Sequence, residues 1–149
     1  AFLARVAGAL DEGDAFLVGI DLVKDRVRLV AAYDDAAGVT AAFNRNVLCV
    51  INRELDADFD PTAFAHVAVW NEERAWIEMR LRAVRDLVVR IGALAVDAPF
   101  AEGDEILTEI SAKYTRERAE SLLAAAGFAP IGWFTDPEEL FGLALARRG

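Results

Sequence analysis

Hydrophobic residues recur along this chain with two different periods, and each period predicts a different kind of element. Apolar side chains spaced three and four residues apart predict α-helices. Three such helices are expected before residue 60, at residues 1–10, 25–33 and 39–55. Their expected buried stripes are Leu3, Val6 and Leu10, then Val27, Val30 and Ala31, then Val39, Phe43, Val47, Val50 and Ile51.

Alternation of apolar and polar residues, which is typical of half-buried strands, takes over after residue 60. Met79 falls on the apolar face of one such strand, where filling a core gap is its ordinary role. We expect these strands to form an antiparallel sheet packed on the two preceding helices. The expected strands are 65–70, 76–82, 86–91 and 104–114, with a hairpin loop at 71–75.

The two ends of the chain carry the pattern of an α/β fold. The continuous apolar run 15–20 predicts a strand buried on both faces, and with the helix before it forms half of a βαβ repeat. After residue 114 we expect a helix that Thr115 caps and Gly127 ends. Two further strands are predicted at 131–134 and 140–145.

The stretch 104–114 places several polar groups where they could act together. In an extended strand Glu109 and Ser111 point to the same side, so a carboxylate and a hydroxyl would face one pocket. Ile106, Thr108 and Ile110 would point to the opposite, packed face. The alternative is an exposed polar edge on which Glu109 is simply solvated.

Composition narrows the classes of partner. A net charge of −9 without a cluster of Lys or Arg disfavours nucleic acid. No apolar run approaches the roughly 20 residues that span a bilayer, so no membrane partner is expected. The single cysteine, Cys49, is expected to pack as a small core hydrophobe, and the lack of a disulfide framework fits a cytoplasmic location. His66, the single histidine, is expected to lie in a strand with no special role, and alone it cannot form a metal site.

Four runs of residues carry a resemblance to a known family. They are Asp21–Lys24, Ala32–Asn46, Glu78–Arg80 and Thr108–Tyr114. In these runs the chain resembles the histidine-specific S-adenosylmethionine-dependent methyltransferases of ergothioneine biosynthesis. The resemblance covers essentially the whole chain but only the carboxyl-terminal half of the family.

The resemblance implies an α/β fold, the carboxyl-terminal part of a Rossmann-like class I methyltransferase sheet with an inserted α+β substrate-binding domain. Residues 1–23 and 114–149 would then belong to the Rossmann-like domain. Residues 24–113 would form the insertion. This division agrees with the change of hydrophobic period.

The resemblance also implies a site for L-histidine. Tyr33 is similar in place to the tyrosine that holds the carboxylate end of the substrate, while Glu109 and Ser111 resemble the pair that grips its imidazole. Phe43 and Met79 resemble residues that line the same pocket. A neutral imidazole has one donor and one acceptor nitrogen, which a carboxylate and a hydroxyl can satisfy together. No catalytic residue and no metal ligand can be assigned.

The glycine-rich loop and the acidic residue that would hold S-adenosylmethionine have no counterpart in residues 1–149. We therefore expect most of the cofactor site to lie in an amino-terminal half that this sequence lacks, and we expect the complete enzyme to be a monomer. The implied activity is Nα-methylation of L-histidine to trimethylhistidine (hercynine). Two alternatives stay open: a class I methyltransferase acting on another small amine, and a non-enzymatic α+β protein-binding module.

Overall fold

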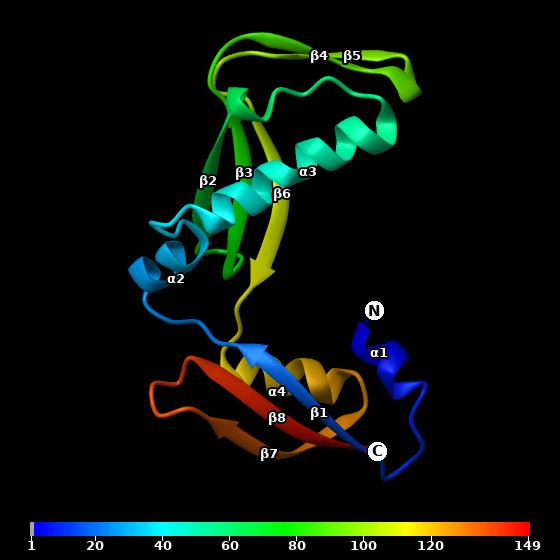
Figure 1. Cartoon of the computed structure of the whole chain (residues 1–149). Coiled ribbons are helices and arrows are strands. Elements are labelled where there is room, and N and C mark those ends of the chain that lie inside the picture. The colour runs from blue at the N-terminus through cyan, green and yellow to red at the C-terminus, as the bar shows by residue number, and fades with distance from the viewer. Residues whose placement is uncertain (1) are drawn as a thin grey trace. The chain divides into compact units, whose positions relative to one another are not determined.

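The computed structural model describes residues 2–149, and it divides into two compact units. One unit combines the residues up to Lys24 with Ala112–Gly149, and the other comprises Asp25–Ser111. Figure 1 shows both units as mixtures of helices and strands. Antiparallel pairing predominates in the sheets of both units. None of the helices described is long and apolar enough to cross a membrane.

The first unit is a three-stranded sheet with helices on one face. The strands are β1 (Ala15–Asp21), β8 (Phe141–Arg148) and β7 (Phe128–Thr135), in the order β1-β8-β7. Helices α1 (Phe2–Ala7) and α4 (Arg116–Ala125) supply residues to the core of this unit. Thr115 caps α4 as predicted, because its side chain accepts the backbone N–H of Arg118. The core residues are Ala7, Ile20, Leu22, Ala119, Leu123, Phe128, Ala144 and Ala146.

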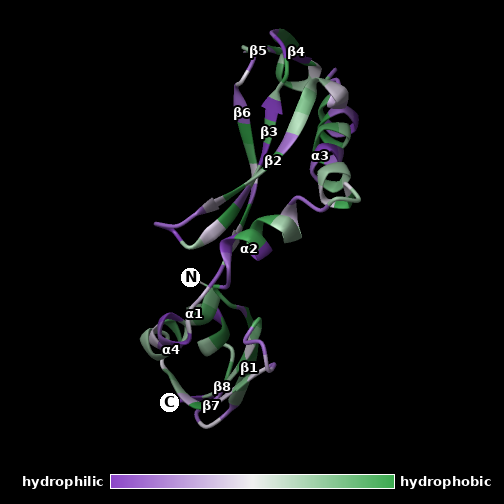
Figure 2. Cartoon of the chain, turned by 90° about the vertical axis from the view of Figure 1, so that its left-hand side faces the viewer, coloured by the Kyte–Doolittle hydropathy of each residue, from purple (hydrophilic) through white to green (hydrophobic). Residues whose placement is uncertain are grey.

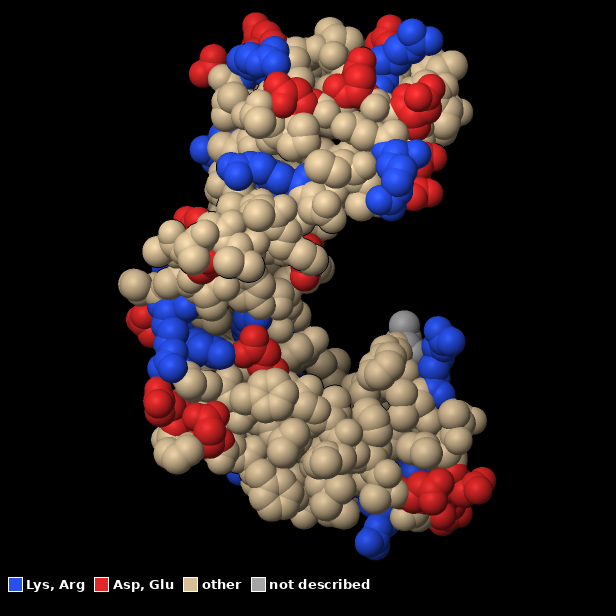
Figure 3. Space-filling model, in the orientation of Figure 1, with Lys and Arg blue, Asp and Glu red and all other residues tan. Residues whose placement is uncertain are grey.

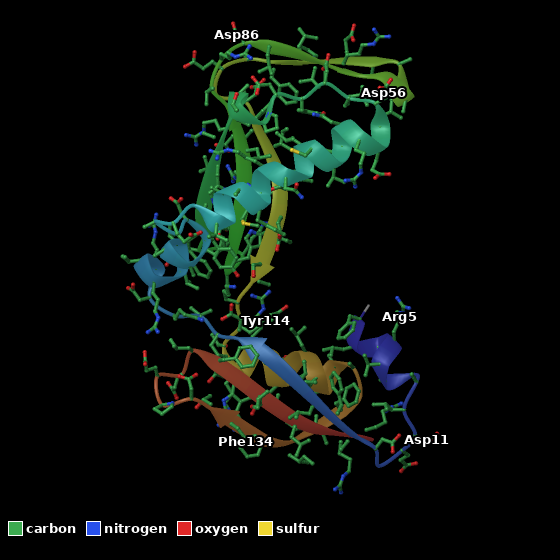
Figure 4. All side chains as sticks on the ribbon, viewed as in Figure 1. Arg5, Asp11, Asp56, Asp86, Tyr114 and Phe134 are labelled. Carbon is green, nitrogen blue, oxygen red and sulfur yellow. The ribbon has the colours of Figure 1, made fainter. Side chains whose placement is uncertain are left out.

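The other face of this sheet is apolar and open among the described residues. Leu17 pairs with Leu145, and Phe134 pairs with Leu143, so these residues share one face by register. Leu17 is 57% exposed and Phe134 is 56% exposed. Figure 3 shows a broad area without charged residues over these strands, and Figure 4 marks Phe134 on β7. The prediction that 15–20 is buried on both faces is therefore wrong for the described residues.

The second unit packs two helices against a three-stranded sheet (Figure 1). The helices are α2 (Arg26–Tyr33) and α3 (Val39–Leu55). The sheet has the order β2-β3-β6, from β2 (Phe64–Asn71), β3 (Trp76–Ala83) and β6 (Glu105–Ala112). The predicted apolar face of β3 is confirmed, since Ile77, Met79, Leu81 and Ala83 are all buried, although Glu78 on the other face is buried too. The core residues are Leu48, Phe59, Ala63, Phe64, Leu81, Ala83 and Val89.

Much of the stripe predicted for each of these helices is exposed, although Ile51 of α3 packs against the core as predicted. In α2 the buried residue is Leu29, whereas Val27 is 75% exposed. In α3 the buried residues are Asn44 and Leu48, whereas Val39, Phe43 and Val47 are exposed. Figure 2 shows hydrophobic and hydrophilic residues interspersed along α3, so helical spacing fits more than one face. Cys49, expected in the core, is exposed because it lies beside the buried position of Leu48.

A second, two-stranded sheet was not predicted as such. Strand β4 (Leu87–Ile91) was expected, but its partner β5 (Val96–Phe100) contains a proline and reads as a loop. Proline cannot donate a ladder hydrogen bond and is confined to edge strands, which a two-stranded ribbon provides. Pro99 pairs with Val88 in this ribbon. Two short 3₁₀ turns, Pro61–Ala63 and Gly92–Leu94, complete the unit.

Candidate functional site

The first pair of predicted site residues meets at the end of α2. Asp25 caps this helix by accepting the backbone N–H of Arg28, and Tyr33 is its last residue. The Tyr33 hydroxyl donates a hydrogen bond to Ser111 Oγ on β6, with 2.7 Å between the oxygens. The structure thus joins two residues that are 78 positions apart in the chain.

The second pair lines a hollow of about 260 Å³, here called the α3–β6 hollow. Phe43 lies on its α3 side and Glu109 on its β6 side, and both residues are exposed. Within residues 2–149, no hydrogen bond or ion pair engages the Glu109 carboxylate, so it is available to a ligand. The full lining is Phe43, Asn44, Asn46, Val47, Val50, Thr108 and Glu109.

Met79 is not brought to this hollow. Its side chain lies on the buried face of β3 and is only 4% exposed. Its backbone carbonyl accepts the Thr108 hydroxyl at 2.8 Å. Its predicted place in the ligand pocket therefore stays a prediction.

A polar network that was not predicted, with a buried asparagine at its centre, underlies these residues. Asn44 is 3% exposed, and its Oδ1 lies 2.6 Å from the Thr108 hydroxyl. Its Nδ2 lies 3.1 Å from the carbonyl oxygen of Arg80 and 2.9 Å from His66 Nδ1. His66 Nε2 lies 2.7 Å from the carbonyl oxygen of Tyr33. His66 thus connects two elements, contrary to the expectation that it has no special role. The only sequence signal was an amide within an otherwise apolar helical stripe.

The face of β3 opposite to Met79 carries a cluster of ion pairs. Glu78 is 6% exposed and accepts hydrogen bonds from the Trp76 indole, the Arg80 guanidinium and the Asn71 amide. These donors, Trp76 first, lower the pKa of Glu78 to about 2. Arg80 also pairs with Glu105. Each of these charges has an opposite partner, so the cluster fits a structural role.

The first unit contains one fully buried lysine. Lys113 Nζ lies 2.6 Å from Asp21 Oδ2, and Lys24 Nζ lies 2.7 Å from Asp21 Oδ1. Burial alone would raise the pKa of Asp21, but the hydrogen bonds from the two lysines outweigh it and leave that pKa below its usual value. Tyr114 lies beside the end of β1 (Figure 4), where its N–H donates to the Asp21 carbonyl at 3.0 Å.

Comparison with known proteins shows the family of this chain. Residues 1–148 match the model of the histidine-specific, S-adenosylmethionine-dependent methyltransferases, and the chain belongs to this family. It is 56% identical over 147 residues to the histidine N-alpha-methyltransferase of Mycolicibacterium smegmatis and 54% identical over 147 residues to that of Mycobacterium tuberculosis. Each match covers 99% of this chain but 46% of the relative. Ergothioneine biosynthesis protein 1 of Neurospora crassa is 30% identical over 151 residues, 97% of this chain and 16% of that protein.

Proposed function

We propose that this chain is the carboxyl-terminal part of an S-adenosylmethionine-dependent enzyme that methylates the α-amino group of L-histidine. The product would be trimethylhistidine (hercynine), an intermediate of ergothioneine biosynthesis. The observation that carries this proposal is the identity of more than half of the residues, along almost the whole chain, to two histidine N-alpha-methyltransferases. The chain spans about half the length of these relatives, so the complete activity requires further polypeptide.

We assign the two units different tasks. Residues 24–113 form the substrate-binding domain, inserted into a Rossmann-like class I methyltransferase domain made of residues 1–23 and 114–149. The insertion is supported by the division of the chain, since one unit is continuous and the other is assembled from both ends of the chain. All five candidate substrate residues belong to the continuous unit.

The candidate site suits an amino acid with a hydrogen-bonding ring. Glu109 accepts a hydrogen bond from the imidazole N–H, and the Ser111 hydroxyl donates one to the other ring nitrogen. Tyr33 holds the carboxylate end of the substrate, while Phe43 and Met79 add apolar surface. The available carboxylate of Glu109 and the closeness of Tyr33 to Ser111 support this arrangement. On binding, the Tyr33 hydroxyl would turn its single hydrogen from Ser111 to the substrate carboxylate. An amino acid without ring nitrogens would leave the carboxylate unpaired and bind more weakly.

The described residues do not fit the cofactor. S-adenosylmethionine supplies the methyl group, and Rossmann-like sheets hold such ligands at glycine-rich turns between a strand and a helix. The two direct connections from a strand to an α-helix, at residues 22–25 and 113–115, contain no glycine. We therefore place most of the cofactor site outside these 149 residues and assign no catalytic base within them. This chain's own contribution is to hold the amine in position, and proximity supplies most of the acceleration of a methyl transfer.

The proposal is tested by completing the enzyme. We would fuse this chain to the part of the Mycolicibacterium smegmatis relative that it does not match, and measure transfer of a radiolabelled methyl group to L-histidine. The fusion should transfer methyl groups, and the 149-residue chain alone should be inactive. Other small amines serve as control substrates. A folded fusion that methylates another amine in preference to histidine would favour the related-methyltransferase alternative, and one that binds neither histidine nor the cofactor would favour a binding module.

A further inference from the structure

We propose that Asn44, His66 and Thr108 form a positioning network for the histidine site, in which His66 fixes Tyr33. The proposal rests on the proposed function, because it concerns the geometry of that site. None of the three is proposed to touch the reacting atoms. Each is instead a polar side chain whose hydrogen bonds reach the elements that carry the substrate residues.

Two backbone carbonyls fix the direction of the hydrogen bonds. Asn44 Nδ2 must face the Arg80 carbonyl, because turning the amide would bring two acceptor oxygens together. The second hydrogen of Nδ2 then points to His66 Nδ1, so this nitrogen accepts and carries no proton. His66 is thereby held as the tautomer with its proton on Nε2, and this N–H donates to the Tyr33 carbonyl at 2.7 Å.

The bond from His66 meets a specific need of α2. The last carbonyl groups of an α-helix have no partner within the helix, and Tyr33 is the last residue of α2. His66 supplies the missing donor to the Tyr33 carbonyl, while the Tyr33 hydroxyl donates to Ser111. Tyr33 is thus fixed at both its backbone and its side-chain end, which sets the position of the hydroxyl toward a substrate.

The other end of the network reaches the α3–β6 hollow. Asn44 follows Phe43 on α3, and Thr108 precedes Glu109 on β6. The Thr108 hydroxyl shares its single hydrogen between Asn44 Oδ1 at 2.6 Å and the Met79 carbonyl at 2.8 Å. The contact with Asn44 ties together the two walls that carry Phe43 and Glu109. One network thus sets both pairs of substrate residues. Its buried member, Asn44, carries a large penalty if it loses its partners.

Two substitutions of His66 separate its two bonds. His66→Gln keeps an N–H at the reach of Nε2 and can still donate to the Tyr33 carbonyl. His66→Asn keeps an acceptor near the place of Nδ1, for Asn44, but is too short to reach Tyr33. In calorimetric titrations of the fusion enzyme, we expect the Asn variant to bind histidine about tenfold more weakly and the Gln variant to stay within about threefold of wild type. Affinity for S-adenosylmethionine should not change in either variant.

A double-mutant cycle tests whether His66 acts through Tyr33. In a Tyr33→Phe background, which lacks the hydroxyl, His66→Asn should weaken histidine binding by less than about twofold further. A tenfold loss that persists in this background would overturn the proposal. So would equal losses in the Gln and Asn variants.

Hydrogen exchange of the fusion enzyme, without any ligand, gives a readout independent of histidine binding and methyl transfer. Amides at the end of α2 should exchange faster in His66→Asn than in wild type or His66→Gln. If the wild-type fusion fails to bind histidine, the proposed function is wrong. If the amides at the end of α2 exchange at equal rates in wild type and both His66 variants, His66 does not fix Tyr33. If His66→Asn does not fold, we would test Thr108→Val in its place, with Thr108→Ser as the control. Equal histidine affinity in these two variants would overturn the proposed network.

Discussion

Glu109 and Ser111 differ in the hydrogen bonds that they already make within the protein. Ser111 accepts a hydrogen bond from Tyr33, whereas no residue of 2–149 engages the Glu109 carboxylate. An exposed carboxylate gains little from other surface charges, but it gains a charge-assisted hydrogen bond from a bound ring N–H. The two residues therefore make separable contributions to binding.

Replacing Glu109 by Gln in the fusion enzyme should lower histidine affinity about tenfold, since the charge that strengthens the bond to the imidazole is lost. Ser111→Ala should cost less, because it removes a neutral partner, and the two losses should not add since both act on one ring. Calorimetric titration with histidine and with S-adenosylmethionine checks this. Equal losses for both ligands would indicate a folding defect, and an unchanged histidine affinity would return Glu109 to a solvated edge.

Glu78 illustrates how a buried charge couples the fold to pH. Its hydrogen bonds hold its pKa at about 2, below the value of roughly 4.3 expected in an unfolded chain. A lowered carboxyl pKa stabilises the folded state above the unfolded pKa, and this contribution is lost as pH falls from about 4.3 toward 2. Unfolding midpoints should thus fall over this range, and the fall should be shallower in Glu78→Gln. A variant with an unchanged pH profile would contradict this assignment.

At the scale of elements, α3 shows how one helix serves two surfaces. Asn44 and Leu48 face the core of the second unit, while Phe43 and Val47 line the α3–β6 hollow. Both stripes have the four-residue spacing of a helix face. Phe43 and Val47 of the predicted stripe therefore face the candidate ligand site, whereas Ile51 packs against the core.

Matched substitutions at two consecutive positions of α3, Leu48 and Val47, test this assignment. Leu48→Ala empties a fully buried position and should lower the free energy of unfolding by about 2 to 5 kcal/mol. Val47→Ala removes a partly exposed side chain and should change it by less than about 1 kcal/mol. Urea denaturation of the two variants gives the comparison. Similar losses would mean that the hollow is part of the core.

For the whole molecule, the open face of the β1-β8-β7 sheet is the dominant feature. The residues exposed on this face are Leu17, Phe134, Phe141 and Leu143. Phe134 pairs directly with Leu143 across β7 and β8. Strand β1 is at the edge of this sheet. Sheets of the Rossmann type are covered on both faces, so in the proposed complete enzyme we expect further polypeptide to cover this face.

The isolated chain should accordingly bind a hydrophobic dye or aggregate. Phe134→Lys should reduce dye binding clearly, whereas Leu107→Lys, at an exposed position of β6, serves as the control and should have little effect. Fluorescence titration and light scattering measure both properties. A monodisperse monomer with a sharp cooperative melt and no dye binding would contradict the expectation that more polypeptide covers the sheet.

The sequence by itself determined the type and order of most elements, because helical and alternating periods are local properties of the chain. It also indicated the family, and its expected boundaries at 23/24 and 113/114 fall within two residues of those between the two units. The tasks of these units stay predictions. Strand β5 was not predicted, because a segment that contains a proline is typical of a loop unless its partner strand is known.

Only the tertiary structure decided which helix faces are buried and which distant residues meet. Two stripes of α3 fit the same period, and packing against β2 and β3 selects the one that contains Asn44 and Leu48. The bonds from His66 to Asn44 and Tyr33 join positions 22 and 33 residues apart. No local pattern encodes such contacts, because a polar side chain finds its partner only after the sheet and the helices have come together.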